Sequence, residues 1–86
     1  MQMNNIIKLE LDENATRLAG NPYGREIYRK QVKDKIDINN INTIEFPERI
    51  KKVASSFVQG FFTELLDTHG YYKMRNIIEI KLSTRG

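Results

Sequence analysis

The sequence contains no cysteine and a single histidine, and its apolar runs are only two or three residues long. Without cysteine the chain has neither disulfides nor thiolate metal ligands, as is usual in a reducing cytosol. With one histidine we also expect no zinc or transition-metal site and no cofactor. The apolar runs are too short for a membrane-spanning helix, and the N-terminus lacks the basic start and long apolar stretch of a secretory signal. We therefore expect a cytoplasmic protein that does not bind a membrane.

The composition is that of one small domain. The 86 residues are 40% hydrophobic and 29% charged, which suffices for a single modest core. No repeat or linker divides residues 1–86. The net charge of +3 bears on the sign of partners rather than on the fold. The ordinary interpretation of the basic residues is a solvated helix face and an exposed loop; they are Arg25, Arg29, Lys30, Lys33 and Lys35, then Arg49, Lys51 and Lys52.

The first half of the chain predicts two strands, a helix and a third strand. Apolar and polar residues alternate over 4–11, as in a half-buried strand, and residues 15–19 follow a turn as a short second strand. Pro22 suits a first helical position, and an apolar stripe predicts a helix over 22–36 in which Gly24 is a close-packing point. Residues 41–46 predict the next strand, which Pro47 ends.

The second half predicts a helix and a last strand. Ser56 followed by Gln59 has the spacing of a capping box, which would start the helix. Gly60 lies close to the apolar stripe of this helix, where a sheet could approach, and Gly70 would end the helix. A final strand is predicted over 77–82. The apolar stripe is Val58, Phe61, Phe62, Leu65 and Leu66.

This order of elements predicts an α/β fold. We expect a mixed, mostly parallel four-stranded sheet, in which an N-terminal hairpin is followed by α-β-α-β, with two helices on one face. The other face would be exposed and would carry Lys8, Glu10, Glu45, Glu79 and Lys81. Because an outer strand of such a sheet leaves an open edge, we also consider a homodimer.

Short motifs near both helices resemble a known family. They are Arg17-Leu18-Ala19-Gly20 before the first helix, Gly24-Arg25-Glu26-Ile27 within it, and Ser55-Ser56-Phe57 followed by Gly60-Phe61-Phe62. From about Leu18 to Leu82 the chain resembles the STAS-like domains, small bacterial relatives of the anti-sigma-factor antagonists. The resemblance implies a STAS-like sheet and a noncatalytic regulatory module that binds a protein, with a histidine-kinase-like ATPase as the expected partner.

The resemblance also implies a site. In the antagonists, a serine at the start of the second helix is phosphorylated by the partner kinase, and Ser55 is the matching position. A phosphate there would meet free N–H groups and the positive end of the helix dipole, and Lys51 and Lys52 would add cations. We therefore predict Ser55 as phospho-acceptor and Ser56 with Gln59 as the helix cap. The predicted partner-binding surface is Arg49, Lys51, Lys52, Ser55 and Ser56.

Two other functions are conceivable for these residues. Catalysis by a serine–histidine pair is not expected, because Ser55 and His69 stand at opposite ends of one helix, roughly 20 Å apart, whereas such groups react within about 3 Å. His69 is better explained by the dipole at the helix end. Nucleic-acid binding is the alternative, because residues 71–75 mix tyrosines with cations. The interpretation that we favour for Tyr71 and Tyr72 is that they pack against the helix end, in a loop before the last strand.

Overall fold

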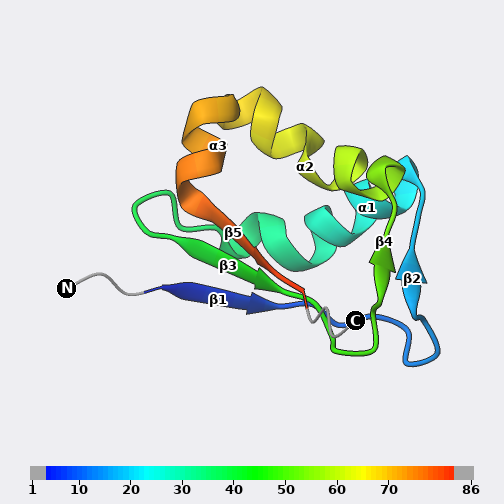
Figure 1. The fold of residues 1–86 in the computed structure, drawn as a ribbon. Helices are drawn as coiled ribbons and strands as arrows, with labels where there is room; N and C mark the ends of the chain where they lie inside the picture. The colour runs from blue at the N-terminus through cyan, green and yellow to red at the C-terminus, as the bar shows by residue number, and fades with distance from the viewer. Residues whose placement is uncertain (1–3, 83–86) are drawn as a thin grey trace.

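The computed structural model describes residues 4–82, in which five strands form two parallel sheets (Figure 1). Strands β1 (Asn5–Lys8), β3 (Asn42–Glu45) and β5 (Ile78–Lys81) make a sheet of order β1-β3-β5. Strand β2 (Arg17–Leu18) pairs with β4 (Lys52–Val53). The predicted α/β class and parallel pairing are confirmed.

The predicted N-terminal hairpin is wrong, and the expected single four-stranded sheet is replaced by these two smaller sheets. β1 runs parallel to β3, and the β2–β4 pair is held by hydrogen bonds from Lys51 N–H to the Thr16 carbonyl (2.7 Å) and from Ala54 N–H to the Leu18 carbonyl (2.8 Å). Strand β4 lies in a segment that the sequence predicted as a connection. Alternation identifies a strand but carries no information about its partner or direction, and the turn residues after β1 are compatible with a hairpin or with a connection to another sheet.

The first predicted helix is present, with a change in its winding. It begins as α1 (Asn21–Ile27), with Pro22 in its first turn, and continues through a π-helical segment η1 (Tyr28–Val32) and a 3₁₀ turn η2 (Lys33–Lys35). The predicted stripe is confirmed at Ile27, Tyr28 and Val32, which are buried in the core.

The second helix, α2 (Ser55–His69), ends where the sequence predicts but is followed by a helix that it does not predict. Gly70 closes α2 with a φ of 81°, and its N–H donates to the Leu66 carbonyl. A short helix α3 (Tyr71–Ile77) then replaces the expected loop and leads directly into β5.

Two glycines set the distance between α1 and α2. A Cβ at Gly24 would overlap the Phe57 carbonyl oxygen and lie 2.8 Å from the Phe61 nitrogen, and a Cβ at Gly60 would overlap the Asn21 carbonyl oxygen. The prediction of close packing at Gly24 is confirmed. Gly60 approaches the backbone of α1 rather than a sheet, so the two helices cross in backbone contact.

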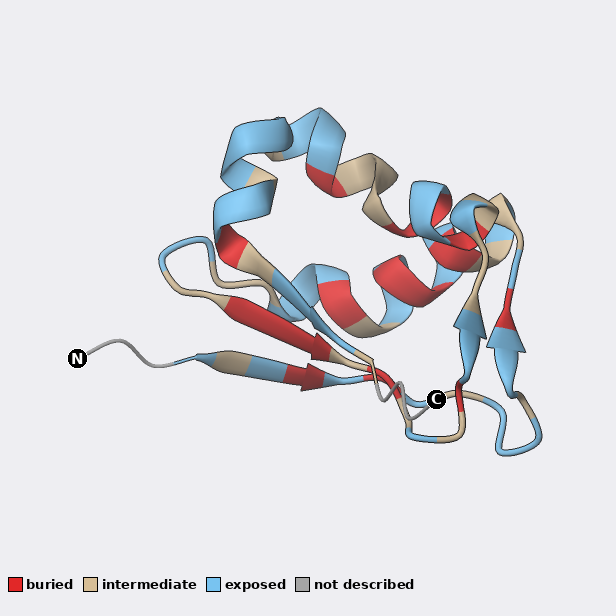
Figure 2. Cartoon of the chain, in the orientation of Figure 1, coloured by how far each residue is buried: buried red, intermediate tan, exposed pale blue. Residues whose placement is uncertain are grey.

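One apolar cluster joins the two sheets to the helices. Figure 1 shows α1 and α2 on the same side of the three-stranded sheet, and Figure 2 shows the buried positions concentrated between these layers. The opposite face carries four of the predicted charged residues, because Lys8, Glu79 and Lys81 are exposed and Glu45 is half-buried. It also carries the exposed Ile6, and Glu10 lies beyond the end of β1. The buried cluster is Ile7, Leu9, Leu18, Ile27, Tyr28, Val32, Ile44, Phe46, Ile50, Phe57, Phe61 and Leu65.

Candidate functional site

Ser55 is the first residue of α2, at the point where β2 and β4 end side by side. Ala54 precedes the helix in an extended conformation, and its N–H is bound to β2 through the Leu18 carbonyl. The first-turn hydrogen bonds are donated by Phe57 and Val58 to the Ala54 carbonyl. The N–H groups of Ser55 and Ser56 precede the first of these donors, so they lie outside the hydrogen-bond pattern of the helix, at its positive end. The Ser55 side chain is exposed at this tip.

Ser56 does not cap the helix, so the predicted capping box with Gln59 is wrong. The N-cap is Ala54 and it makes no side-chain cap hydrogen bond. Ser56 was expected to be the N-cap, just before the helix. The helix instead begins at Ser55, so Ser56 lies inside the first turn. There its Oγ accepts a hydrogen bond from the Gly20 N–H at 3.0 Å, while Gln59 is exposed. Ser56 thus ties the start of α2 to the residue that precedes α1.

The two serines should consequently respond differently to truncation. Ser56→Ala leaves a half-buried N–H of Gly20 without its acceptor, and we expect the free energy of unfolding to fall by about 1 kcal/mol. Ser55→Ala removes an exposed hydroxyl and should change stability by less than about 0.5 kcal/mol. Urea denaturation followed by circular dichroism measures both. Equal effects of the two substitutions would contradict the distinct roles assigned to these serines.

The predicted basic surface divides into a structural and an exposed part. Arg49 is half-buried, and its guanidinium donates to the carbonyls of Leu11 (2.6 Å) and Asp12 (2.9 Å). It holds the loop between β1 and β2 and is only partly exposed. Lys51 and Lys52 are exposed, and Lys52 lies opposite Arg17 in the β2–β4 register.

The Arg17–Lys52 pair adds a cation that the sequence alone did not assign to the site. Like charges directly opposite each other on paired strands repel and destabilise a sheet. This pair therefore concentrates positive charge three residues before Ser55, on strands that end at the helix tip. Arg17 lies opposite Lys52 because β2 pairs in parallel with β4. The predicted hairpin would have paired β2 with β1 instead, so it did not predict this contact.

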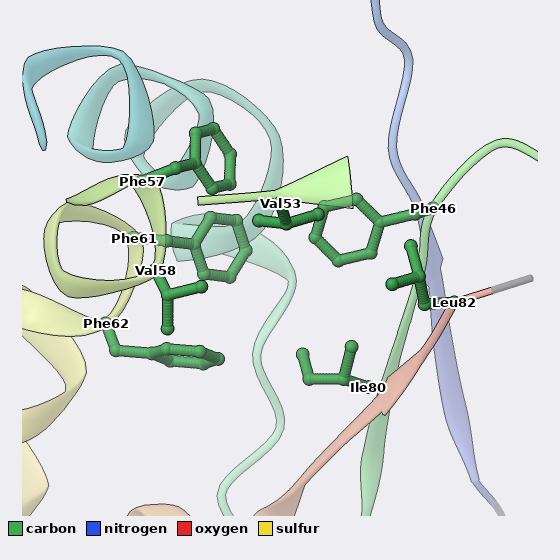
Figure 3. Close-up of a pocket in the computed structure, with 8 residues that line it drawn as sticks. All are labelled: Phe46, Val53, Phe57, Val58, Phe61, Phe62, Ile80 and Leu82. Atoms are coloured by element: carbon green, nitrogen blue, oxygen red, sulfur yellow. The ribbon is translucent and has the colours of Figure 1, made fainter. Parts of the chain in front are cut away.

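An open apolar groove of about 280 Å³ lies between α2 and β5 (Figure 3). Val58 and Ile80 are 39% and 43% exposed at this groove, and Phe62 lines it as a half-buried side chain. Ile80 stays this exposed because α2 does not close over the outer edge of β5. The lining side chains are Phe46, Val53, Phe57, Val58, Phe61, Phe62, Ile80 and Leu82.

Ser55 stands at the head of an exposed apolar stripe on α2. At 3.6 residues per turn, positions 55, 58, 62 and 66 fall on one face of a helix. Val58 and Leu66 are each 39% exposed and Phe62 is half-buried between them. The sequence predicted these three as part of the buried stripe. The structure instead buries Phe57, Phe61 and Leu65 and leaves this second stripe facing solvent.

The other residues singled out in the sequence lie apart from this tip. His69 is the last residue of α2, and Ser55 the first, so the helix separates them as predicted. Tyr71 and Tyr72 do not pack against the helix end: they are 56% and 78% exposed on α3. Between residues 4 and 82, no three histidine, aspartate or glutamate side chains gather as metal ligands, and no helix has the length and apolar character needed to cross a membrane.

Comparisons of this chain with protein-family models, with curated proteins and with solved structures find no match.

Proposed function

We propose that this protein is a noncatalytic, STAS-like protein-interaction module that is regulated by phosphorylation of Ser55. The observation that favours this function is the position of Ser55, an exposed hydroxyl at the head of the apolar stripe Val58–Phe62–Leu66. Exposed apolar area of this kind is typical of surfaces that bind other proteins. By resemblance to the anti-sigma-factor antagonists, the partner is a protein of the histidine-kinase-like ATPase class.

The placement of the family-like motifs supports the proposal. The segment Arg17–Gly20 forms β2 and the approach to α1, while Gly24 and Gly60 lie at the crossing of α1 with α2. These residues hold the start of α2 against the start of α1. The motifs therefore occupy the parts of the fold that present Ser55.

The chemistry at the tip favours a phosphate as the regulatory group. A phosphate on Ser55 would lie near the first N–H groups of α2, and Lys51, Lys52 and Arg17 supply positive charge on the adjoining segment. The same phosphate would place about two negative charges at the end of an apolar stripe. Docking of an apolar partner surface would then require desolvation of that charge, so phosphorylation should weaken binding.

Affinity capture from the native extract tests this function. The wild-type protein and Ser55→Ala should recover the same partner, whereas Ser55→Asp and Leu66→Lys should recover at least about tenfold less, because each buries a charge at the contact. Leu66 is exposed, so its substitution should leave the fold intact. The control is Asn76→Asp, which adds a charge at an exposed position of α3 and should bind as wild type does. Equal recovery by wild type, Ser55→Asp and Leu66→Lys would refute the proposal.

Nucleic-acid binding is the second candidate because of the tyrosines on α3. The rings of Tyr71 and Tyr72 meet edge to face at 5.6 Å, and both are exposed beside Lys73 and Arg75. Such a surface suits base stacking combined with phosphate contacts. Binding of labelled DNA or RNA that weakens steeply with salt, and is lost with Tyr72→Ala, would favour this candidate over the first.

The basic face of the first helix gives this candidate less support. Arg29 pairs with Glu64 at 2.8 Å, Lys33 lies 3.5 Å from the same carboxylate, and Lys30 pairs with Glu26. The hydrogen bond from Arg29, assisted by the charge of Lys33, holds the pKa of Glu64 below its usual range. Two carboxylates therefore offset much of the charge of these three cations, which leaves the first helix, including η1 and η2, with less unpaired positive charge for a phosphate backbone.

A further inference from the structure

Strand β5 is an edge of the three-stranded sheet and borders the apolar groove. Within residues 4–82, its pairing is with β3 alone. An unpaired strand edge is a template for pairing with another chain. The other edge of the sheet, β1, lies away from the groove residues of α2 and β5.

The backbone hydrogen bonds of β5 show which residues face outward. The carbonyl of Lys81 accepts from Phe46 N–H at 3.0 Å, and the carbonyl of Ile77 accepts from the Asn42 side chain at 3.1 Å. These odd-numbered residues therefore direct their backbone groups toward β3. Because successive residues of a strand alternate in direction, Ile78, Ile80 and Leu82 direct their N–H and C=O groups to the open edge.

We infer that a second copy of this chain pairs antiparallel with β5, about a two-fold axis at Ile80. In this register Ile80 faces Ile80 of the partner subunit, and both residues have outward backbone groups that suit a hydrogen-bonded pair. Ile78 faces Leu82 of the partner subunit in the same way. The next pair sets Glu79 opposite Lys81 of the partner subunit, and the symmetry repeats this contact.

The charge match selects this register and this partner. Glu79 and Lys81 are both exposed on the polar face of the sheet, so the two intersubunit pairs form there without burial. Opposite charges directly across an antiparallel pair stabilise it, and like charges destabilise it. The other edge strand offers no such match, because Lys8 is its one charged residue.

The apolar face of the same strand fits the groove. Ile80 is 43% exposed there and lies across the groove from Val58 and Phe62 (Figure 3). The two-fold axis is perpendicular to the sheet, so the apolar faces of both copies lie on the same side. The partner's β5 then adds to the open edge of β5 beside the groove. The result is a continuous sheet of order β1-β3-β5-β5-β3-β1.

This dimer is independent of the proposed function, since it needs neither a modified Ser55 nor another protein. Its test is a charge exchange followed by sedimentation equilibrium at low salt. In each single variant, Glu79→Lys or Lys81→Glu, residues 79 and 81 carry the same charge and face each other in both symmetry-related intersubunit pairs. Each single variant should therefore raise the dimer dissociation constant roughly tenfold. The double variant Glu79→Lys/Lys81→Glu restores both pairs and should return that constant to within about twofold of wild type.

Circular dichroism of each variant confirms folding, because Lys81→Glu also approaches Glu45 across the β3–β5 pair. A wild-type protein that stays monomeric at its highest soluble concentration would overturn the inference. A dimer that is equally strong in the single variants, or a folded double variant that does not recover association, would also overturn it.

Discussion

Gly60→Ala is expected to lower the free energy of unfolding by about 3 kcal/mol or more, although alanine is the better helix former by about 1 kcal/mol. The added Cβ would overlap the Asn21 carbonyl oxygen and lie 2.8 Å from its carbon. These neighbours are backbone atoms and cannot rotate away as a flexible side chain could. The helices must separate, and the ring packing between Tyr28 and Phe61 (5.8 Å between centroids) must loosen with them. Urea denaturation measures the loss.

Gly70→Ala is the matched control for this prediction. Nothing lies within 4 Å of a Cβ at Gly70, but the φ of 81° is unfavourable for alanine. With a ψ of 166°, this conformation is one that residues other than glycine rarely adopt, so conformational strain alone should cost about 1 to 3 kcal/mol. If Gly60→Ala were as stable as wild type, the backbone contact of α1 with α2 would be refuted.

Asn42→Asp is the second substitution for which we expect a large loss, about 3 kcal/mol near neutral pH. The Asn42 side chain is fully buried at the start of β3. Its Oδ1 accepts from the Asn5 side chain and from Asp37 N–H, both at 2.8 Å. Its Nδ2, which carries two hydrogens, lies within hydrogen-bond distance of the carbonyls of Asp37 (2.9 Å), Asn40 (3.2 Å) and Ile77 (3.1 Å), so two of these carbonyls share one hydrogen. Asn42 thus joins three segments that are far apart in the sequence.

A carboxylate at position 42 could still accept hydrogen bonds from the Asn5 side chain and from Asp37 N–H. Its second oxygen, however, would replace the Nδ2 donor and would lie against three carbonyl oxygens. Burial and these oxygens favour the protonated form, so the pKa of the new carboxyl in the folded state should lie above its value in the unfolded chain. The variant should therefore be most stable, relative to wild type, below the unfolded pKa, and should lose stability as the pH rises through the folded pKa. Urea denaturation between acid and neutral pH tests this.

The exposed substitution Asn76→Asp provides the control for Asn42→Asp and should show no comparable pH dependence. A flat difference between Asn42→Asp and wild type across this pH range would contradict the hydrogen-bond arrangement at Asn42.

The sequence predicted local elements well where periodicity was strong. The alternation around Ile7 and the stripe through Ile27 and Val32 correspond to β1 and to the first helix, and Gly70 ends α2 as expected. These features depend on residues near each other in the chain. The partners of each strand depend on distant residues, and the same alternation is compatible with a hairpin or with parallel pairing. The short strand β2 was predicted, within residues 15–19, but with the wrong partner, and β4 was missed.

The candidate site was predicted only in part for the same reason. The position of Ser55 follows from the local start of a helix. The role of Arg49 does not, because its hydrogen-bond acceptors lie 37 and 38 residues earlier in the chain. Ser56 has the spacing of a capping box, yet its Oγ accepts a hydrogen bond from the N–H of Gly20, which is distant in the sequence. The groove was also missed, because the apolar pattern of β5 does not reveal that one edge of the strand stays uncovered.

Photo-crosslinking in the native cell tests most directly whether α2 presents a docking surface controlled at its first serine. A photoreactive residue introduced in place of Leu66 should capture one protein other than this chain, and the same residue in place of Asn76 should not. Adding Ser55→Asp to the Leu66 variant should abolish the product. A product that forms equally from both positions, or persists with Ser55→Asp, would contradict the proposed role of this surface, as would the absence of any product from position 66.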